Sequence, residues 1–174
     1  RVFARMVEHD MAIYVLPHID AGGKVYEWRN WVDFDPLAEH EGYSYSSLVL
    51  NTIAEALAKT VQPTTHVELS LSGEMGTSLF KHPAAYRQIV RDLKSKPELN
   101  DLKVGFSLNH NKIAGQQNPN GSSDIVLDPN SRPEMQALID ECDFIGFSCY
   151  VPVSVPPTAE DFVRGVNKFI GQFE

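Results

Sequence analysis

Positive charge, cysteine and long apolar segments are all scarce in this sequence. It has 15 lysines and arginines against 23 aspartates and glutamates, which gives a net charge of −8 at pH 7. No basic cluster or stripe of mixed aromatic and basic residues is present, which argues against nucleic acid and anionic membrane surfaces as partners. No apolar run reaches the length of about 20 residues that a membrane-spanning helix needs.

Motifs for metals, cofactors and phosphates are also missing. The two cysteines, Cys142 and Cys149, are too few for a disulfide framework. No Cys-x-x-Cys or His-Glu-x-x-His spacing suggests a metal site. The stretches GEMG and NPNG lack the spacing and the Lys-Ser/Thr pair of a phosphate-binding loop. The sequence therefore predicts neither a metal nor a cofactor.

The chain does contain apolar strand patterns that alternate with amphipathic helix patterns. Strands are expected at 11–19, 67–73, 103–108 and 143–151, and helices at 1–10, 46–61, from 83, at 133–141 and from 158. The first strand is apolar enough to be buried on both faces. A long loop at 20–45, rich in aromatic and charged residues, is typical of a functional segment. This order predicts one α/β domain over 1–174 with parallel strands.

The segment 66–80, HVELSLSGEMGTSLF, is central to the functional prediction. Its strand residues alternate between two faces, with Val67, Leu69, Leu71 and Gly73 on one and Glu68, Ser70, Ser72 and Glu74 on the other. The glycines then end the strand, so Glu74 is expected at its carboxyl end, where parallel α/β proteins place their chemistry. The alternative interpretation of Glu74 is a solvated carboxylate at the start of a loop.

The four strands share a second pattern, because small or polar residues follow one face and large apolar residues the other. The first face carries Tyr14, Leu16 and His18, then Ser70, Ser72 and Glu74, then Gly105, Ser107 and Asn109, then Gly146, Ser148 and Tyr150. An open sheet with helices on both faces needs bulky residues on both, whereas a crowded barrel interior accepts small ones. The pattern favours a (β/α) barrel with His18, Glu74, Asn109 and Tyr150 at its upper rim.

Three short segments carry a resemblance to a known group of enzymes. GEM, LNHN and DFIGFSCYVP resemble strands four, five and six of the clan A glycoside hydrolases, which are (β/α)8 barrels that retain configuration by means of two glutamates. LPHIDAGGKVYEWRNW is similar to the third-strand segment of family 113, the β-mannanase-like branch. The resemblance implies that Glu74 is the acid/base, that Tyr150 hydrogen-bonds the nucleophile, and that His18 and Trp28 line the sugar site.

The sequence departs from this group at two points. Many members have asparagine where this chain has Gly73, and their nucleophilic glutamate belongs to strand seven, which is not found here. Four βα units are half of eight, and 174 residues are few against about 250 for a full barrel. We therefore expect a partial barrel, inactive by itself, whose remaining strands come from further sequence or from a second copy of the chain.

Each candidate residue also has a structural alternative. Asn109 is suited to a sugar hydroxyl but also to capping a loop, and His18 could be a satisfied core histidine. Trp28 offers an apolar ring face to a sugar, while Trp31 is expected to serve packing. Glu68 is expected to be a structural carboxylate at the barrel floor.

Three functions follow in order of preference. The first is a retaining glycosidase acting on β-linked oligosaccharides or polysaccharides, with mannan as one candidate. The second is a non-catalytic sugar-binding or scaffolding barrel, which the missing nucleophile would fit. The third is a different barrel enzyme that uses His18 and Asp20 at a metal, a pairing that is common by chance.

Overall fold

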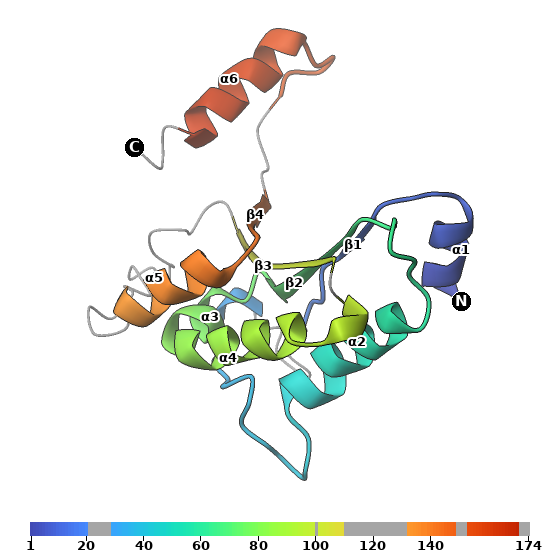
Figure 1. The fold of residues 1–174 in the computed structure, drawn as a ribbon. Helices are drawn as coiled ribbons and strands as arrows, with labels where there is room; N and C mark the ends of the chain where they lie inside the picture. Colours follow the sequence, from blue (N-terminus) through green and yellow to red (C-terminus); the bar gives the residue numbers. More distant parts are fainter. Residues whose placement is uncertain (21–28, 100, 110–131, 149–152, 171–174) are drawn as a thin grey trace.

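The computed structural model describes residues 1–20, 29–99, 101–109, 132–148 and 153–170. Its strands are β1 (Ile13–Val15), β2 (Val67–Gly73), β3 (Leu102–Asn109) and β4 (Phe144–Ser148). They form one sheet in the order β1-β2-β3-β4, and every neighbouring pair is parallel (Figure 1). The predicted α/β chain with a parallel sheet in sequence order is confirmed.

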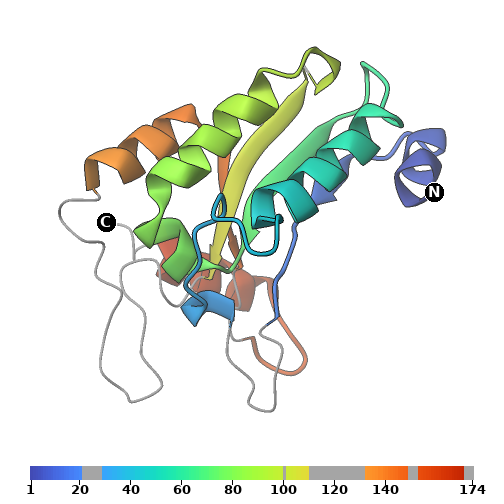
Figure 2. The same ribbon diagram turned by 90° about the horizontal axis from the view of Figure 1, so that it is seen from below.

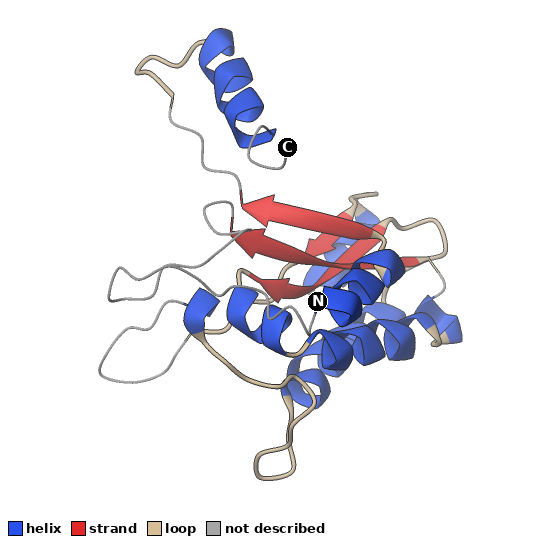
Figure 3. Ribbon diagram, turned by 90° about the vertical axis from the view of Figure 1, so that its left-hand side faces the viewer, coloured by secondary structure: helices blue, strands red, loops and turns tan. Residues whose placement is uncertain are grey.

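The helices that lie between successive strands cover one face of the sheet. The described helices are α1 (Val2–Glu8), α2 (Asn51–Ala58), α3 (Gly76–Lys81), α4 (Pro83–Lys94), α5 (Arg132–Glu141) and α6 (Ala159–Ile170). A π-helical turn η2 (Ser46–Leu50) leads into α2, and short 3-10 turns occur at η1 (Arg29–Trp31) and η3 (Pro97–Leu99). Figure 2 looks onto the face of the sheet that carries α2, α4 and α5. Figures 1 and 3 show α6 standing apart from that layer.

Local sequence signals account for the main helix, α4. Pro83 occupies its first turn, where a missing backbone N–H costs nothing. Its buried stripe consists of Tyr86, Ile89, Val90 and Leu93, as the spacing predicts. The stripe packs on the apolar face of the sheet, where Leu69, Leu71, Val104 and Phe106 are buried. Truncating one such core side chain to alanine typically costs about 2–5 kcal/mol.

One expectation about the first half of the chain was wrong. Strand β1 is not buried on both faces, since Tyr14 is 49% exposed and no described helix covers that side of the sheet. The helix expected from residue 83 is present as α4, and a short helix that the sequence did not predict, α3, precedes it. The amino end of α3 is capped by Asn30, whose Oδ1 accepts a hydrogen bond from the Gly76 N–H at 2.7 Å. No local pattern could reveal a cap that comes from so far along the chain.

The face of the sheet opposite the helices is concave. The Tyr14 hydroxyl of β1 hydrogen-bonds with Ser107 Oγ of β3 at 2.8 Å. The Tyr14 ring also meets the Phe144 ring of β4 edge to face, with centroids 5.9 Å apart. In a flat sheet β1 and β4 would lie about 14 Å apart, and their side chains would stand parallel without meeting. These contacts therefore need a strongly curled sheet.

Candidate active site

The carboxyl ends of the strands bring several of the predicted site residues to one edge of the sheet. Figure 3 shows the strand arrows pointing the same way. Glu74 follows β2 directly, and Asn109 is the last residue of β3 and is 8% exposed. His18 follows β1 and is exposed. Trp28 and Tyr150 lie outside the described residues, so their predicted roles remain predictions.

A β-bulge at the end of β2 changes the predicted alternation. Ser70 pairs with Gly105, but Gly73 pairs with Ser107, so β2 has one residue more than β3 between these pairs. Gly73 was expected on the face of Leu69 and Leu71, and this was wrong. The extra residue turns Gly73 to the side of Ser107, and a bulge of this kind cannot be seen in one strand's own pattern.

Gly73 is packed against the segment that follows β1. A Cβ atom at Gly73 would lie 2.0 Å from His18 Cδ2 and 2.7 Å from the Pro17 carbonyl oxygen. Real Cβ atoms do not approach other heavy atoms so closely, so only glycine fits unless the neighbours move. The glycine at this position thus has a local reason, because the His18 ring occupies the space that a side chain would need.

Glu74 itself has an uncommon backbone conformation and is buried. Its φ is +60°, in the left-handed region, and its N–H donates to the Ser107 carbonyl at 3.1 Å. The residue is only 5% exposed. A non-glycine residue in this region costs about 1–3 kcal/mol and persists only where the surrounding structure holds it there. Strain at a buried carboxylate beside a strand end is typical of a functional position.

The carboxylate of Glu74 has a charged partner that the sequence did not suggest. Arg29 Nη1 donates to Glu74 Oε2 at 3.2 Å, and Arg29 Nη2 donates to Asp20 Oδ1 at 2.9 Å. Hydrogen bonding and charge attraction from Asp20, followed by those from Glu74, raise the pKa of Arg29 against the effect of burial. The guanidinium therefore stays charged between two carboxylates, one 72% exposed at Asp20 and one 7% exposed at Glu74.

Arg29 is placed by its neighbour in the chain, Asn30. Asn30 is 3% exposed. Besides capping α3, it accepts a hydrogen bond at its carbonyl from Thr77 Oγ1 at 2.5 Å. Ser78 Oγ donates to the Phe34 carbonyl at 2.6 Å and fixes the same loop a second time. The long loop predicted to be functional is thus fastened to α3 directly below Glu74. The motif WRNW was the only sequence signal for Arg29 and Asn30.

A small group of hydroxyls lies on the concave face below Glu74. Ser70 Oγ donates to the Ser72 carbonyl at 2.8 Å and lies 3.2 Å from Ser107 Oγ, within hydrogen-bonding distance. A Cβ at Gly146 would come within 2.5 Å of Ser107 Oγ, so the small residues of this face are already in contact across strands. Glu68 lies at the other end of β2, where its Oε1 is 2.8 Å from His66 Nε2.

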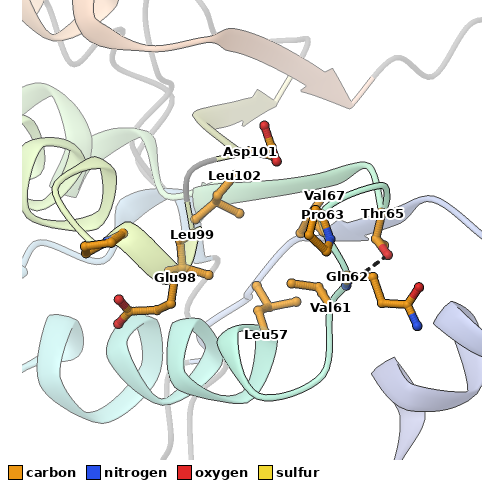
Figure 4. Close-up of a pocket in the computed structure, with 11 residues that line it drawn as sticks. Leu57, Val61, Gln62, Pro63, Thr65, Val67, Glu98, Leu99, Asp101 and Leu102 are labelled. Atoms are coloured by element: carbon orange, nitrogen blue, oxygen red, sulfur yellow. Dashed lines mark hydrogen bonds between the residues drawn. The ribbon is translucent and has the colours of Figure 1, made fainter.

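A cavity of about 280 Å³ lies at the opposite end of the strands from Glu74 (Figure 4). Leu57, Val67, Leu99 and Leu102 form its apolar wall. Parallel α/β proteins place their reactions at the carboxyl ends of the strands rather than at the amino ends. The candidate active site is therefore the edge around Glu74, and this cavity is separate from it.

Among the residues that the structure describes, no group of three His, Cys, Asp or Glu side chains is arranged to hold a metal ion. The hypothesis of a metal site at His18 and Asp20 is not favoured, because the Asp20 carboxylate faces a guanidinium, a poor neighbour for a metal cation.

No helix in the described part of the chain is long and apolar enough to cross a membrane. No protein-family model matches the chain, and neither a curated protein nor a solved structure matches it.

Proposed function

We propose that these residues form strands three to six of a (β/α)8 retaining glycoside hydrolase in which Glu74 is the acid/base. The substrate is a β-linked glycan, and β-mannan is the first to test. One observation carries the proposal: a glutamate that is 5% exposed sits at the carboxyl end of a parallel strand in a left-handed conformation. That is the place where barrel enzymes hold their reacting groups.

The curl of the sheet supports the barrel. The contacts of Tyr14 with Ser107 and Phe144 draw the first strand toward the fourth across the concave face. Gly105, Ser107 and Gly146 line that face, and residues this small suit a crowded interior. The strands that would close the barrel come, on this proposal, from further sequence or from a second copy.

Two features of the Glu74 carboxyl group support the acid/base role. Arg29 holds Oε2, while Oε1 has no hydrogen-bond partner among the described residues and is left to exchange a proton with the glycosidic oxygen. A second carboxylate about 5–5.5 Å away would attack the anomeric carbon from the other side. We assign it to a seventh strand outside these residues, and assign sugar binding to His18, Asn109, Trp28 and Tyr150.

The test is Glu74→Gln in the full-length protein. Glutamine keeps the shape of the side chain but cannot deliver a proton, so cleavage of the best unactivated substrate in a panel of β-linked oligosaccharides should fall about 10²–10⁴-fold. An activated aryl glycoside needs little protonation, so its first step should be affected much less. Azide should restore part of the turnover by attacking the glycosyl-enzyme without a base and should give a β-glycosyl azide. Glu68→Gln is the control and should keep activity.

Three outcomes would argue against this assignment. Equal loss on both substrate types without azide rescue would remove Glu74 from the acid/base role. Unchanged activity would remove it from the mechanism. Binding of oligosaccharides by the wild-type protein with no cleavage of any member of the panel would favour the non-catalytic sugar-binding barrel instead.

A further inference from the structure

We infer that Arg29 is a positioning residue for Glu74: it holds one carboxylate oxygen so that the other faces the bond to be broken, and Asp20 holds Arg29 in turn. This inference rests on the proposed function, because it assigns Arg29 a role through the acid/base. It concerns a residue that contacts Glu74 without itself touching the reacting atoms.

The geometry fixes one end of the carboxylate only. The contact between Arg29 Nη1 and Glu74 Oε2, at 3.2 Å, is single rather than forked. The backbone of Glu74 is already held by its N–H bond to Ser107. The backbone contact leaves the side-chain torsions of Glu74 unrestricted. A charge-assisted hydrogen bond to one carboxylate oxygen restricts them. A glutamate side chain without this contact would sample several rotamers, and a small misplacement of a catalytic group is costly.

Asp20 completes the arrangement from the solvent side. Its carboxylate is 72% exposed, so its ion pair with Arg29 is weakened by water and adds little stability. The ion pair instead orients the guanidinium, because Asp20 binds Nη2 on the solvent side while Nη1 points inward to Glu74. Arg29 bonds the two carboxylates from two different nitrogens of its planar guanidinium, whereas a lysine would have to reach both from a single ammonium nitrogen.

The remaining nitrogen of Arg29 adds nothing to stability through hydrogen bonds within the described residues. Arg29 Nε is buried and has no hydrogen-bond partner, the one such side-chain atom among the described residues. Leaving a buried donor unpaired is unfavourable. The only hydrogen bonds of the guanidinium in the described structure go to the two carboxylates, so its effect is directed at them.

The experiment compares Arg29→Met, Arg29→Lys and Asp20→Asn in the full-length protein. With an unactivated β-linked oligosaccharide, Arg29→Met should lower kcat about 10²-fold, the scale of a misplaced catalytic group, with a smaller change in KM. With an activated aryl glycoside the first step should change much less. Lysine should give an intermediate loss, and Asp20→Asn a smaller loss in the same direction. In the Glu74→Gln background, Arg29→Met should cause little further loss.

Arg87→Met is the matched control. Its guanidinium also lies between two carboxylates, Glu134 and Glu141, but in the helix layer. It should lower stability without changing kcat. The inference is overturned if Arg29→Met leaves kcat unchanged. It is also overturned if Arg29→Met lowers kcat equally on both substrates and causes the same further loss in the Glu74→Gln background. If Glu74→Gln shows neither the substrate-dependent loss nor azide rescue, the proposed function fails. That measurement does not depend on any Arg29 variant.

Discussion

Two adjacent residues, Gly73 and Glu74, determine what the end of β2 can do. The absent side chain at Gly73 lets the His18 ring pack directly on the strand end. The left-handed conformation of Glu74 then turns its side chain toward Arg29, where it is buried. Asp10 and Glu41 also have positive φ angles, but both are exposed, so neither combines strain with burial.

At this scale we predict the effect of Gly73→Ala. The new methyl group must displace the His18 ring and the Pro17 carbonyl, and overpacking of this kind typically costs about 1–3 kcal/mol. Urea unfolding monitored by fluorescence measures the loss. The control is Gly42→Ala, which strains a backbone at φ +83° but meets no atom within 4 Å. If Gly73→Ala loses no more stability than Gly42→Ala and keeps catalytic activity, the His18 ring does not lie against Gly73 as the structure has it.

Among the elements, α4 and α5 are joined by a network of ion pairs rather than by apolar contacts alone. The Glu141 carboxylate accepts hydrogen bonds from Arg91 at 2.6 Å and 2.9 Å and from Arg87 at 2.6 Å. Lys94 Nζ donates to the Glu141 carbonyl at 2.7 Å and pairs with Asp143. Hydrogen bonds from Arg91 and then Arg87 lower the pKa of Glu141 to about 2 from an ordinary value of about 4.5.

The depressed pKa of Glu141 predicts how stability depends on pH. A carboxyl that is more acidic in the folded state stabilises the fold above its unfolded pKa, and that contribution is lost as pH falls from about 4.5 toward 2. Glu141→Gln should therefore lower stability at pH 6 and reduce the difference between pH 6 and pH 2.5. Urea midpoints across this range measure it. Glu55→Gln, which removes an exposed pair with Lys59, should leave the pH dependence unchanged.

On the scale of the whole molecule, apolar side chains remain uncovered on both the sheet and the last helix. The exposed large residues include Tyr14 at 49%, Ile145 at 37%, Phe162 at 50%, Val163 at 59% and Val166 at 45%. Three of these form one side of α6, which stands apart from the helix layer (Figure 1). On the proposed barrel, further strands would cover Tyr14 on the concave face. Further helices would cover α6 and Ile145, which lies on the same face of the sheet as Phe106.

This exposure predicts the behaviour of the 174 residues expressed alone. Uncovered apolar surface and unpaired strand edges favour self-association, so the chain should dimerise or bind a hydrophobic dye. Light scattering and dye fluorescence measure the two properties together. Phe162→Ser and Val163→Ser should both weaken the response, whereas Ala84→Ser, at an exposed position of α4, should not. A stable monomer that binds no dye would contradict the partial-barrel proposal.

The sequence by itself determined the order of the elements and the position of Glu74 at a strand end. Alternation along β2, the stripe on α4 and the proline at its first turn are signals between residues close in sequence, and steric propensities act at that range. The alternation of small and large residues along the strands also indicated that one face of the sheet packs on helices and the other does not. These local patterns were confirmed because each strand or helix must bury its own apolar side.

Only the tertiary structure decided which groups surround Glu74. The bulge at Gly73 depends on the register of β2 against β3, and the cap of α3 depends on an asparagine 46 residues earlier. The pairing of Arg29 with Glu74 spans 45 residues and forms only once the loop is fastened to α3. The residues around a charged loop side chain do not indicate its partner, because the partner depends on which distant segments the folded chain brings together.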